Sequence, residues 1–213
     1  MNKMPVLKAL VGVLLTTSLA AAHAEERPWY FSVDAGISVA SDPTFAAGRL
    51  TTRRGVAYGG AFGRHLGPNW RVEAAIAYRN NPVRRVTSPG FDTDPKDADW
   101  ASLLVTVNAL YDFDGFQLGT AQVRPYVGLG LGRAQEVDTD LRAGGAEREY
   151  SGSGSARQLM LGLRWSYGSP WVADVGLSFA DAGTVSFKAT GGAQSFNARY
   201  RATSAIARVG YRF

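Results

Sequence analysis

The chain is dominated by segments of about ten residues in which apolar side chains alternate with polar or small ones. In residues 70–79, Trp70 and Val72 share one phase, and Arg71 and Glu73 occupy the other. A period of two predicts a β-strand with one apolar and one polar face, because successive side chains point to opposite sides. Eight segments follow this pattern: 30–39, 55–65, 70–79, 102–113, 123–132, 158–167, 171–179 and roughly 200–213.

The first residues predict export from the cytoplasm. Two lysines precede the apolar run of residues 9–22, and a small-residue motif ends at Ala24. This order is typical of a secretory signal peptide. We expect cleavage after Ala24, which divides the chain into a signal peptide at 1–24 and a single domain at 25–213. An uncleaved anchor is the alternative, although the run is shorter than the ~20 apolar residues that span a bilayer as a helix.

The composition excludes several classes of protein. Cysteine is absent, so the domain has neither a disulfide nor thiolate chemistry. The formal charge of +5 falls to +3 when Lys3 and Lys8 are removed, and so small a surplus does not indicate a nucleic-acid partner. After the signal region, no apolar run is long enough for a membrane helix. If the chain spans a membrane, it must do so as a closed barrel, because lipid offers no partner to an unpaired backbone.

The connections between the predicted strands alternate in length. Short turns are expected at 66–69, 114–121 and 168–170, and long polar loops at 40–54, 80–98, 134–156 and 180–198. In outer-membrane barrels the strand count is even, and the short turns and both termini face the periplasm. We therefore predict an all-β fold, an eight-stranded antiparallel up-and-down transmembrane β-barrel in the cell outer membrane, with periplasmic termini and the long loops outside.

Aromatic residues gather at the ends of the predicted strands, as expected where amphipathic rings meet the membrane interfaces. The residues expected in the periplasmic girdle are Trp70, Tyr111, Phe113, Trp165, Tyr167, Trp171, Tyr211 and Phe213. The candidates for the outer girdle are Tyr58, Tyr78, Trp100, Phe179 and Tyr200. A soluble β-sandwich is the alternative, but it would bury its apolar faces against each other and has no need of tryptophans at one set of turns.

The opposite phase of the strands carries charges among small residues. An eight-stranded barrel is just wide enough for side chains to fill it, and an unpaired charge inside would be costly. We predict a polar Arg–carboxylate network that plugs the interior, since the planar fork of arginine suits bidentate pairing. A selectivity ring in a narrow porin-like channel for small solutes or ions is the alternative. The predicted network comprises Asp34, Arg71, Glu73, Arg79, Asp112, Arg124, Arg164, Asp174, Arg208 and Arg212.

The chain offers no catalytic, metal or cofactor site that we would predict. His65, the one histidine after the signal region, lies beside a short turn, away from the long loops where an outer-membrane enzyme would act. The glycines of residues 128–132 recur every two residues, unlike a dinucleotide fingerprint, so we expect them to make room inside the barrel. The aspartates of residues 91–100 lack the glycine and glutamate of a helix-loop-helix calcium site, which favours a solvated loop.

Four arginines lie in the outward phase near the long loops. In the outer leaflet they would meet lipopolysaccharide phosphates, which arginine binds well. The alternative is that they are solvated charges at the bases of the loops. These residues are Arg133, Arg157, Arg199 and Arg201. The partners expected from this pattern are outer-membrane lipid and lipopolysaccharide.

Three stretches carry a resemblance to a known family: RPYVGLGLG (124–132), VTVNALYDF (105–113) and the terminal RVGYRF (208–213). With them, the whole of residues 25–213 resembles the small outer-membrane β-barrel family of the OmpA transmembrane-domain and opacity-protein type. The resemblance implies an eight-stranded barrel in a Gram-negative envelope. Such a barrel would serve envelope integrity, adhesion or antigenic display through its long loops, or act as a weak pore.

The resemblance also has implications for partners. Val209, Tyr211 and Phe213 are similar to the terminal signal that the barrel-assembly machinery reads during insertion. The long loops imply a host or surface ligand, and the family implies no catalytic residues. The chain departs from the pattern of full-length OmpA, in which a peptidoglycan-binding domain follows the barrel, and this departure puts a tether to the cell wall in doubt.

Overall fold

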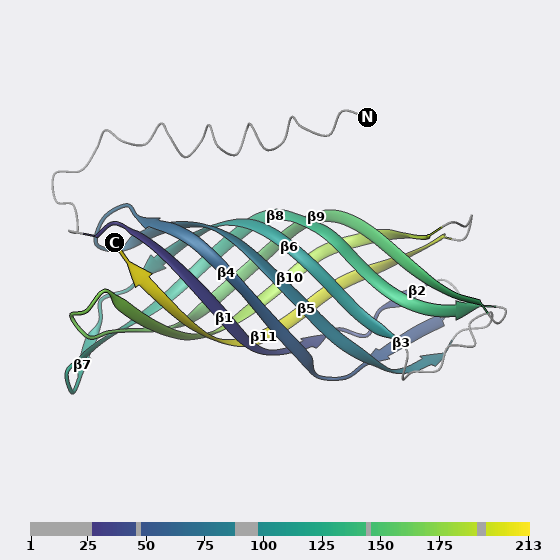
Figure 1. Cartoon of the computed structure of the whole chain (residues 1–213), viewed down its shortest axis with the longest axis horizontal. Coiled ribbons are helices and arrows are strands. Elements are labelled where there is room, and N and C mark those ends of the chain that lie inside the picture. The colour runs from purple at the N-terminus through teal and green to yellow at the C-terminus, as the bar shows by residue number, and fades with distance from the viewer. Residues whose placement is uncertain (1–26, 46–47, 88–97, 144–145, 191–194) are drawn as a thin grey trace, which may run out of the picture.

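The computed structural model describes residues 27–45, 48–87, 98–143, 146–190 and 195–213 (Figure 1). Eight long strands form its wall: β1 (Trp29–Ala40), β4 (Gly55–His65), β5 (Trp70–Thr87), β6 (Asp99–Asp112), β8 (Ala121–Ala143), β9 (Ala146–Ser166), β10 (Trp171–Ala189) and β11 (Ser195–Arg212). The predicted signal peptide and most of the aspartate-rich segment lie outside the described residues.

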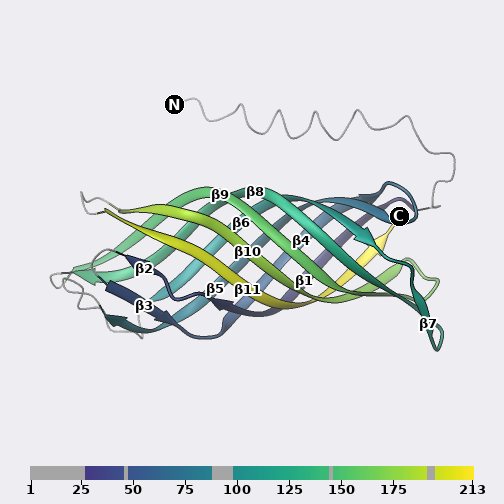
Figure 2. The same ribbon diagram turned by 180° about the vertical axis from the view of Figure 1, so that it is seen from behind.

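The wall is closed and antiparallel throughout. Each long strand pairs with the next one along the chain, and β1 pairs with β11 from Tyr30–Arg212 to Ala40–Ala202. The first and last strands therefore join and leave no open edge. The predicted eight-stranded up-and-down barrel is confirmed, and Figure 2 shows the same tilted wall from behind.

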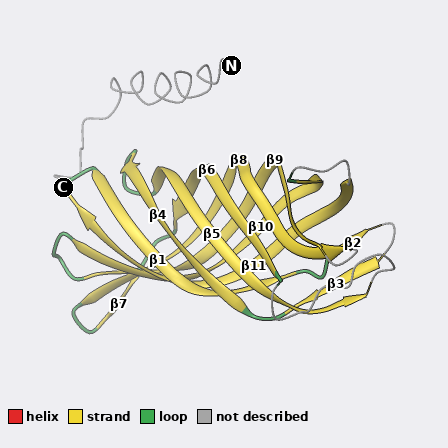
Figure 3. Ribbon diagram, turned by 45° about the vertical axis from the view of Figure 1, so that its right-hand side comes forward, coloured by secondary structure: helices red, strands yellow, loops and turns green. Residues whose placement is uncertain are grey.

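Three short strands lie at the ends of the barrel. β2 (Thr44–Phe45) and β3 (Gly48–Thr52) form a hairpin between β1 and β4, and β3 pairs with β5. β7 (Phe116–Leu118) pairs with β8 in the connection between β6 and β8. Figure 3 shows β7 and the C-terminus at one end, and β2 and β3 at the other. None of the described segments forms a helix long and apolar enough to cross a membrane.

The predicted long loops are wrong in part, because the strands continue into them. β8 and β9 extend to Ala143 and Ala146, well into the segment 134–156 that we expected to be a loop. This segment is polar, but its outward side chains need no lipid if they lie beyond the membrane. The polar composition of residues 134–156 is typical of a loop, yet most of this segment lies in two paired strands.

Part-way along the barrel, the outer face of the wall changes from apolar to polar and the inner face from polar to apolar. Toward the short turns the outward residues are apolar, as at Val33 and Leu131. Beyond a bulge at residues 134–137 the phase of β8 shifts, so that Val137 points inward and Asp138 outward. We call the two parts the lower half, toward the short turns, and the upper half, toward the long connections.

A second bulge makes the same change in β10. The register shifts between Asp181 and Gly183, and Gly183 has a φ of 68°, a left-handed conformation that favours glycine. Beyond it Val185 and Phe187 are fully buried. The upper half is therefore apolar inside and polar outside, like a barrel that stands in water.

The upper interior is filled by a contiguous group that we call the outer apolar cluster. Its members are Ala40, Leu50, Val83, Ala98, Trp100, Leu104, Ala134, Val137, Leu141, Tyr150, Ala156, Ala180, Ala182, Val185, Phe187, Ala189, Ala198, Tyr200 and Ala202. The Trp100 ring packs against Phe187 at 5.1 Å and Tyr200 at 6.1 Å between centroids. These rings close the upper half of the barrel.

The assignment of Trp100 and Tyr200 to an outer girdle is wrong. Both side chains are fully buried inside the barrel. Trp100 shares the phase of inward Thr106, and Tyr200 shares the phase of inward Arg208, so strand alternation already pointed both rings inward. By contrast Tyr58 is exposed on the wall, as expected.

The aromatic residues expected at the short-turn end do gather there. Trp70 packs against Tyr111 at 5.1 Å, and Trp171 packs against Tyr211 at 5.0 Å, in edge contacts. Phe213 lies against Phe31 on the closing strand at 6.4 Å. The chain therefore ends in a belt of exposed rings on the outside of the lower half.

Candidate functional site

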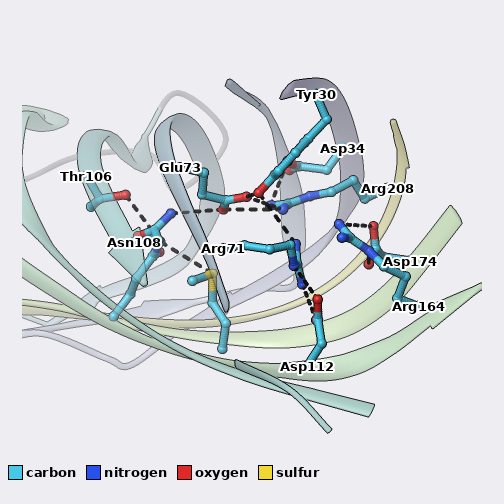
Figure 4. A network of polar contacts seen from close by, with 12 residues as sticks. Tyr30, Asp34, Arg71, Glu73, Thr106, Asn108, Asp112, Arg164, Asp174 and Arg208 are labelled. Carbon is cyan, nitrogen blue, oxygen red and sulfur yellow. Dashed lines mark hydrogen bonds and ion pairs between the residues drawn. The ribbon is translucent and has the colours of Figure 1, made fainter. Parts of the chain in front are cut away.

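The lower half of the interior is filled by polar side chains of the inward phase (Figure 4). Arg71 of β5 donates from Nε and Nη2 to the two carboxylate oxygens of Asp112 on β6, each at 2.7 Å. Both side chains are 1% exposed. A bidentate contact is the strongest arrangement of an arginine–carboxylate pair. It neutralises two buried charges, either of which would be destabilising without its partner.

A second group of charged contacts joins β1, β5 and β11. The Arg208 guanidinium donates through Nη1 to Glu73 Oε2 at 3.1 Å and through Nη2 to Asp34 Oδ2 at 3.4 Å. Glu73 also accepts from Asn108 Nδ2 at 3.1 Å. One arginine is therefore shared between two carboxylates, one of which also accepts from an amide.

A third pair spans β9 and β10. Arg164 and Asp174 are directly opposite in the register, and Arg164 Nε donates to Asp174 Oδ1 at 2.9 Å. Seven of the ten predicted interior residues thus lie in Arg–carboxylate contacts.

Sequence reasoning missed Tyr30 as a member of this network. Its hydroxyl donates to Glu73 Oε2 at 2.9 Å, and its ring lies 5.5 Å from the Arg164 guanidinium carbon. The signal was present, because Tyr30 shares the phase of Asp34. The ring contributes cation–π contacts as well as a hydrogen bond.

Three predicted residues make other contacts. Arg79 donates to the hydroxyls of Ser204 at 3.1 Å and Ser178 at 3.3 Å, at the boundary with the outer apolar cluster. Arg124 lies at the rim and donates to backbone carbonyls, including that of Pro68 at 2.6 Å. Arg212 donates to the carbonyl of Ser169. The first separates the polar and apolar layers, and the other two tie the short turns together.

One small space lies between these layers among the described residues. A space of ≈ 20 Å³ lies beside Arg79, Gln158 and Arg208. This is enough for about one water molecule. The buried Arg79 Nη1 has no protein partner in the described part of the chain, and such a water would satisfy it.

The glycines of residues 128–132 make room for this packing, as the sequence suggested. Gly128 and Gly130 are buried in the inward phase of β8. A Cβ on Gly130 would collide with Asn108 Oδ1 and lie 2.8 Å from Gln158 Cγ. Any larger residue there would displace the amides that border the polar network.

The outer wall carries a separate cluster around Asp181. Its Oδ2 accepts from Arg199 Nη2 at 2.7 Å, Arg157 Nη2 at 3.1 Å and Arg201 Nε at 3.4 Å. We call these four residues the Asp181 cluster. The fourth predicted outward arginine, Arg133, instead donates to Ser153 Oγ at 3.1 Å. The sequence placed Asp181 in a loop and gave no signal for its central position.

The family model of the outer membrane protein beta-barrel domain matches residues 9–213. The chain belongs to the outer-membrane β-barrel family. It is therefore a protein of the cell outer membrane. The short turns at the end of its lower half face the periplasm, as in other barrels of this kind. No curated protein sequence matches the chain.

Solved structures of small outer-membrane barrels share this fold. Neisserial surface protein A is similar with a TM-score of 0.54 and 17% identity, over 87% of this chain and 97% of that one. OprG from Pseudomonas aeruginosa gives a TM-score of 0.53 and 17% identity, over 88% of this chain and 97% of that one. At 17% identity, this similarity shows a shared fold and nothing more.

The reversal of polarity places the outer-membrane barrel in its bilayer. On β10 the outward residues are apolar from Trp171 to Phe179, and Asp181 is the first outward charge. Ten steps of about 3.3 Å along a strand tilted by about 40° rise ~25 Å. This is the height of the apolar band of outer-membrane barrels. The Asp181 cluster therefore lies at the outer edge of the hydrocarbon, and the upper half stands beyond it.

The upper half also carries crowded carboxylates on its outer face. Asp138 lies beyond the membrane, and its pKa is raised to about 6, first by burial and then by Asp99 and Glu136 nearby. A raised carboxyl pKa means that the folded protein binds the proton more tightly than the unfolded chain. Its contribution to the free energy of unfolding therefore falls as the pH rises from about 4 to about 6.

Replacing Asp138 by Asn should remove this repulsion. We expect the free energy of unfolding at pH 7 to rise by up to about 1 kcal/mol, a figure reduced by solvent screening at a partly exposed site. Urea titrations at pH 4 and pH 7 measure the effect, which should vanish at pH 4. Asp114→Asn, on an exposed periplasmic turn, is the control and should change neither value. An equal gain at both pH values would contradict the electrostatic explanation.

Proposed function

We propose that this outer-membrane barrel is a closed structural and surface-interaction protein rather than a pore. The observation that carries the proposal is the filled interior, in which the polar network below and the outer apolar cluster above occupy successive layers. Envelope integrity, adhesion or antigenic display would then depend on the outer surface and the long connections. Rigid scaffolds with exposed loops are where recognition commonly resides.

The energetics of the two layers support this role. A water path would require displacement of bidentate pairs such as Arg71–Asp112, and leaving one buried charge unpaired costs about 3–5 kcal/mol. It would also require removal of Trp100 and its neighbours from the upper interior. These costs combine along a single path, so thermal opening would be rare.

The remaining functional assignments belong to the same proposal. The protein acts without catalysis, since His65 packs against the Tyr30 ring at 5.5 Å near the periplasmic turns, far from the outer surface. Residues 1–24 direct export and are cleaved. Val209, Tyr211 and Phe213, which line the lipid face or rim of the last strand, are read by the barrel-assembly machinery during insertion.

Bilayer conductance of the pure, refolded protein tests the closed-barrel proposal. We expect no steady unitary current from the wild-type protein, because neither layer leaves a continuous water path. Arg79→Ser, which changes the charge between the two layers, should be equally silent. A steady current in the wild type whose size changes in Arg79→Ser would overturn the proposal and establish the narrow channel instead.

A further inference from the structure

The Asp181 cluster has a net positive charge, because three arginines share a single aspartate. Three guanidinium groups converge on one carboxylate oxygen, and the side chains of Arg157, Arg199 and Arg201 are 68%, 45% and 53% exposed. Each guanidinium has five N–H donors, so most of the donors stay available after the contacts with Asp181 are made. Like charges held this close repel one another, and a second anion would relieve that repulsion.

A groove runs along the outer wall beside this cluster. It has a volume of ≈ 430 Å³ and is bordered by Asp181 and Arg201. Val39 of β1 and Phe179 of β10 form its sides, and Thr203 of β11 lies between them in the register. Both apolar side chains are exposed on the membrane side of the wall.

Small outward side chains follow the groove toward the middle of the membrane. Below Thr203 the outward residues of β11 are Ala205 and Ala207, which are small. The neighbours of Ala205 are the larger Ile37 on β1 and Leu177 on β10. The wall is therefore recessed along one strand from the charged cluster down into the apolar band.

We propose that the Asp181 cluster and this groove form a specific site for a phosphorylated, acylated lipid of the outer leaflet, the lipid A portion of lipopolysaccharide. A headgroup phosphate would accept hydrogen bonds from Arg157, Arg199 and Arg201. One acyl chain would lie over Thr203 along β11. The proposal goes beyond the closed-barrel function, since it assigns a ligand to the outer wall.

Two features favour a lipid over a soluble anion. The guanidinium groups lie at the outer edge of the apolar band, which is the level of lipid phosphates. The groove opens onto the hydrocarbon side of the wall, where a free anion has nothing to gain from an apolar surface. Arginine binds phosphate through paired hydrogen bonds, so charge and geometry agree at this level.

Binding of bis-phosphorylated lipid A to the refolded protein in detergent micelles tests the site, with native mass spectrometry as the readout. The triple variant Arg157→Gln/Arg199→Gln/Arg201→Gln should bind at least about tenfold more weakly, because it removes the phosphate donors. Thr203→Phe should fill the groove and weaken binding about threefold or more. Arg133→Gln is the matched control and should bind like the wild type. Slower gel migration after boiling verifies that each variant is folded.

Two probes separate the parts of the ligand. Dephosphorylated lipid A should bind the wild type as weakly as lipid A binds the triple variant, and inorganic phosphate should fail to displace lipid A. Wild-type affinity in the triple variant, or an equal loss in Arg133→Gln, would overturn the proposed site. Displacement by inorganic phosphate, or full binding by Thr203→Phe, would overturn the acyl groove. These outcomes are independent of the conductance test.

Discussion

Replacing Arg71 by Met should destabilise the barrel by about 3–5 kcal/mol, because it leaves the Asp112 carboxylate buried without its charged partner. Both oxygens of Asp112 accept hydrogen bonds from Arg71 at 2.7 Å. The measurement is the free energy of unfolding in urea, with the protein refolded into lipid vesicles. Methionine keeps most of the volume, so the loss reports charge and hydrogen bonding rather than a cavity.

The double variant Arg71→Met/Asp112→Leu should recover most of this loss, since it removes both charges together. Arg199→Gln provides a control, because its guanidinium is exposed on the outer wall and its loss should change stability by less than about 0.5 kcal/mol. The Arg71 guanidinium carbon also lies 5.9 Å from the centre of the Tyr30 ring and 5.3 Å from that of the Tyr126 ring. A double variant no more stable than the single one would mean that Arg71 acts through these two rings instead.

Replacing Trp100 by Ala should cost about 3–5 kcal/mol, the usual cost of truncating a large buried aromatic. Trp100 lies at the centre of the outer apolar cluster and contacts Phe187 and Tyr200. The upper half is surrounded by water, so this loss is one of hydrophobic burial as in a soluble core. Urea unfolding of the vesicle-bound protein is again the measurement.

Tyr58→Ala is the matched control for Trp100→Ala, since Tyr58 is an aromatic residue exposed on the outside of the wall. It loses contact with lipid and with the Tyr78 ring but creates no interior cavity, so we expect a clearly smaller effect. Equal losses in the two variants would show that the upper interior is not a packed core.

The sequence predicted the lower half well because one physical rule governs it. Hydrocarbon outside and a narrow space inside force strict alternation, so the phase of Arg71, Asp112 and Arg208 could be assigned residue by residue. The belt of rings at the short turns followed from the same rule. The choice of partner did not, because which carboxylate meets Arg208 depends on register and shear, which composition does not determine.

The upper half was misjudged because its surroundings differ. Beyond the membrane both faces of a strand can carry polar residues, and the segment 134–156 therefore resembled a loop. The bulges near Gly183 and Ala134 shift the phase, and nothing in the local composition marks them except one glycine. Trp100 was missed for a different reason. The predicted strand began at residue 102, whereas β6 begins at Asp99, and alternation along the longer strand points the Trp100 ring inward.

The packed apolar interior of the upper half has a consequence for the height of the barrel. Eight steps along β10 from Asp181 to Ala189 raise the wall by ~20 Å at the same tilt, and no part of that rise depends on lipid for support. The part of the barrel beyond the membrane is thus supported by packing within the protein itself. Contacts made by the described upper ends of these strands would therefore take place well beyond the outer edge of the hydrocarbon.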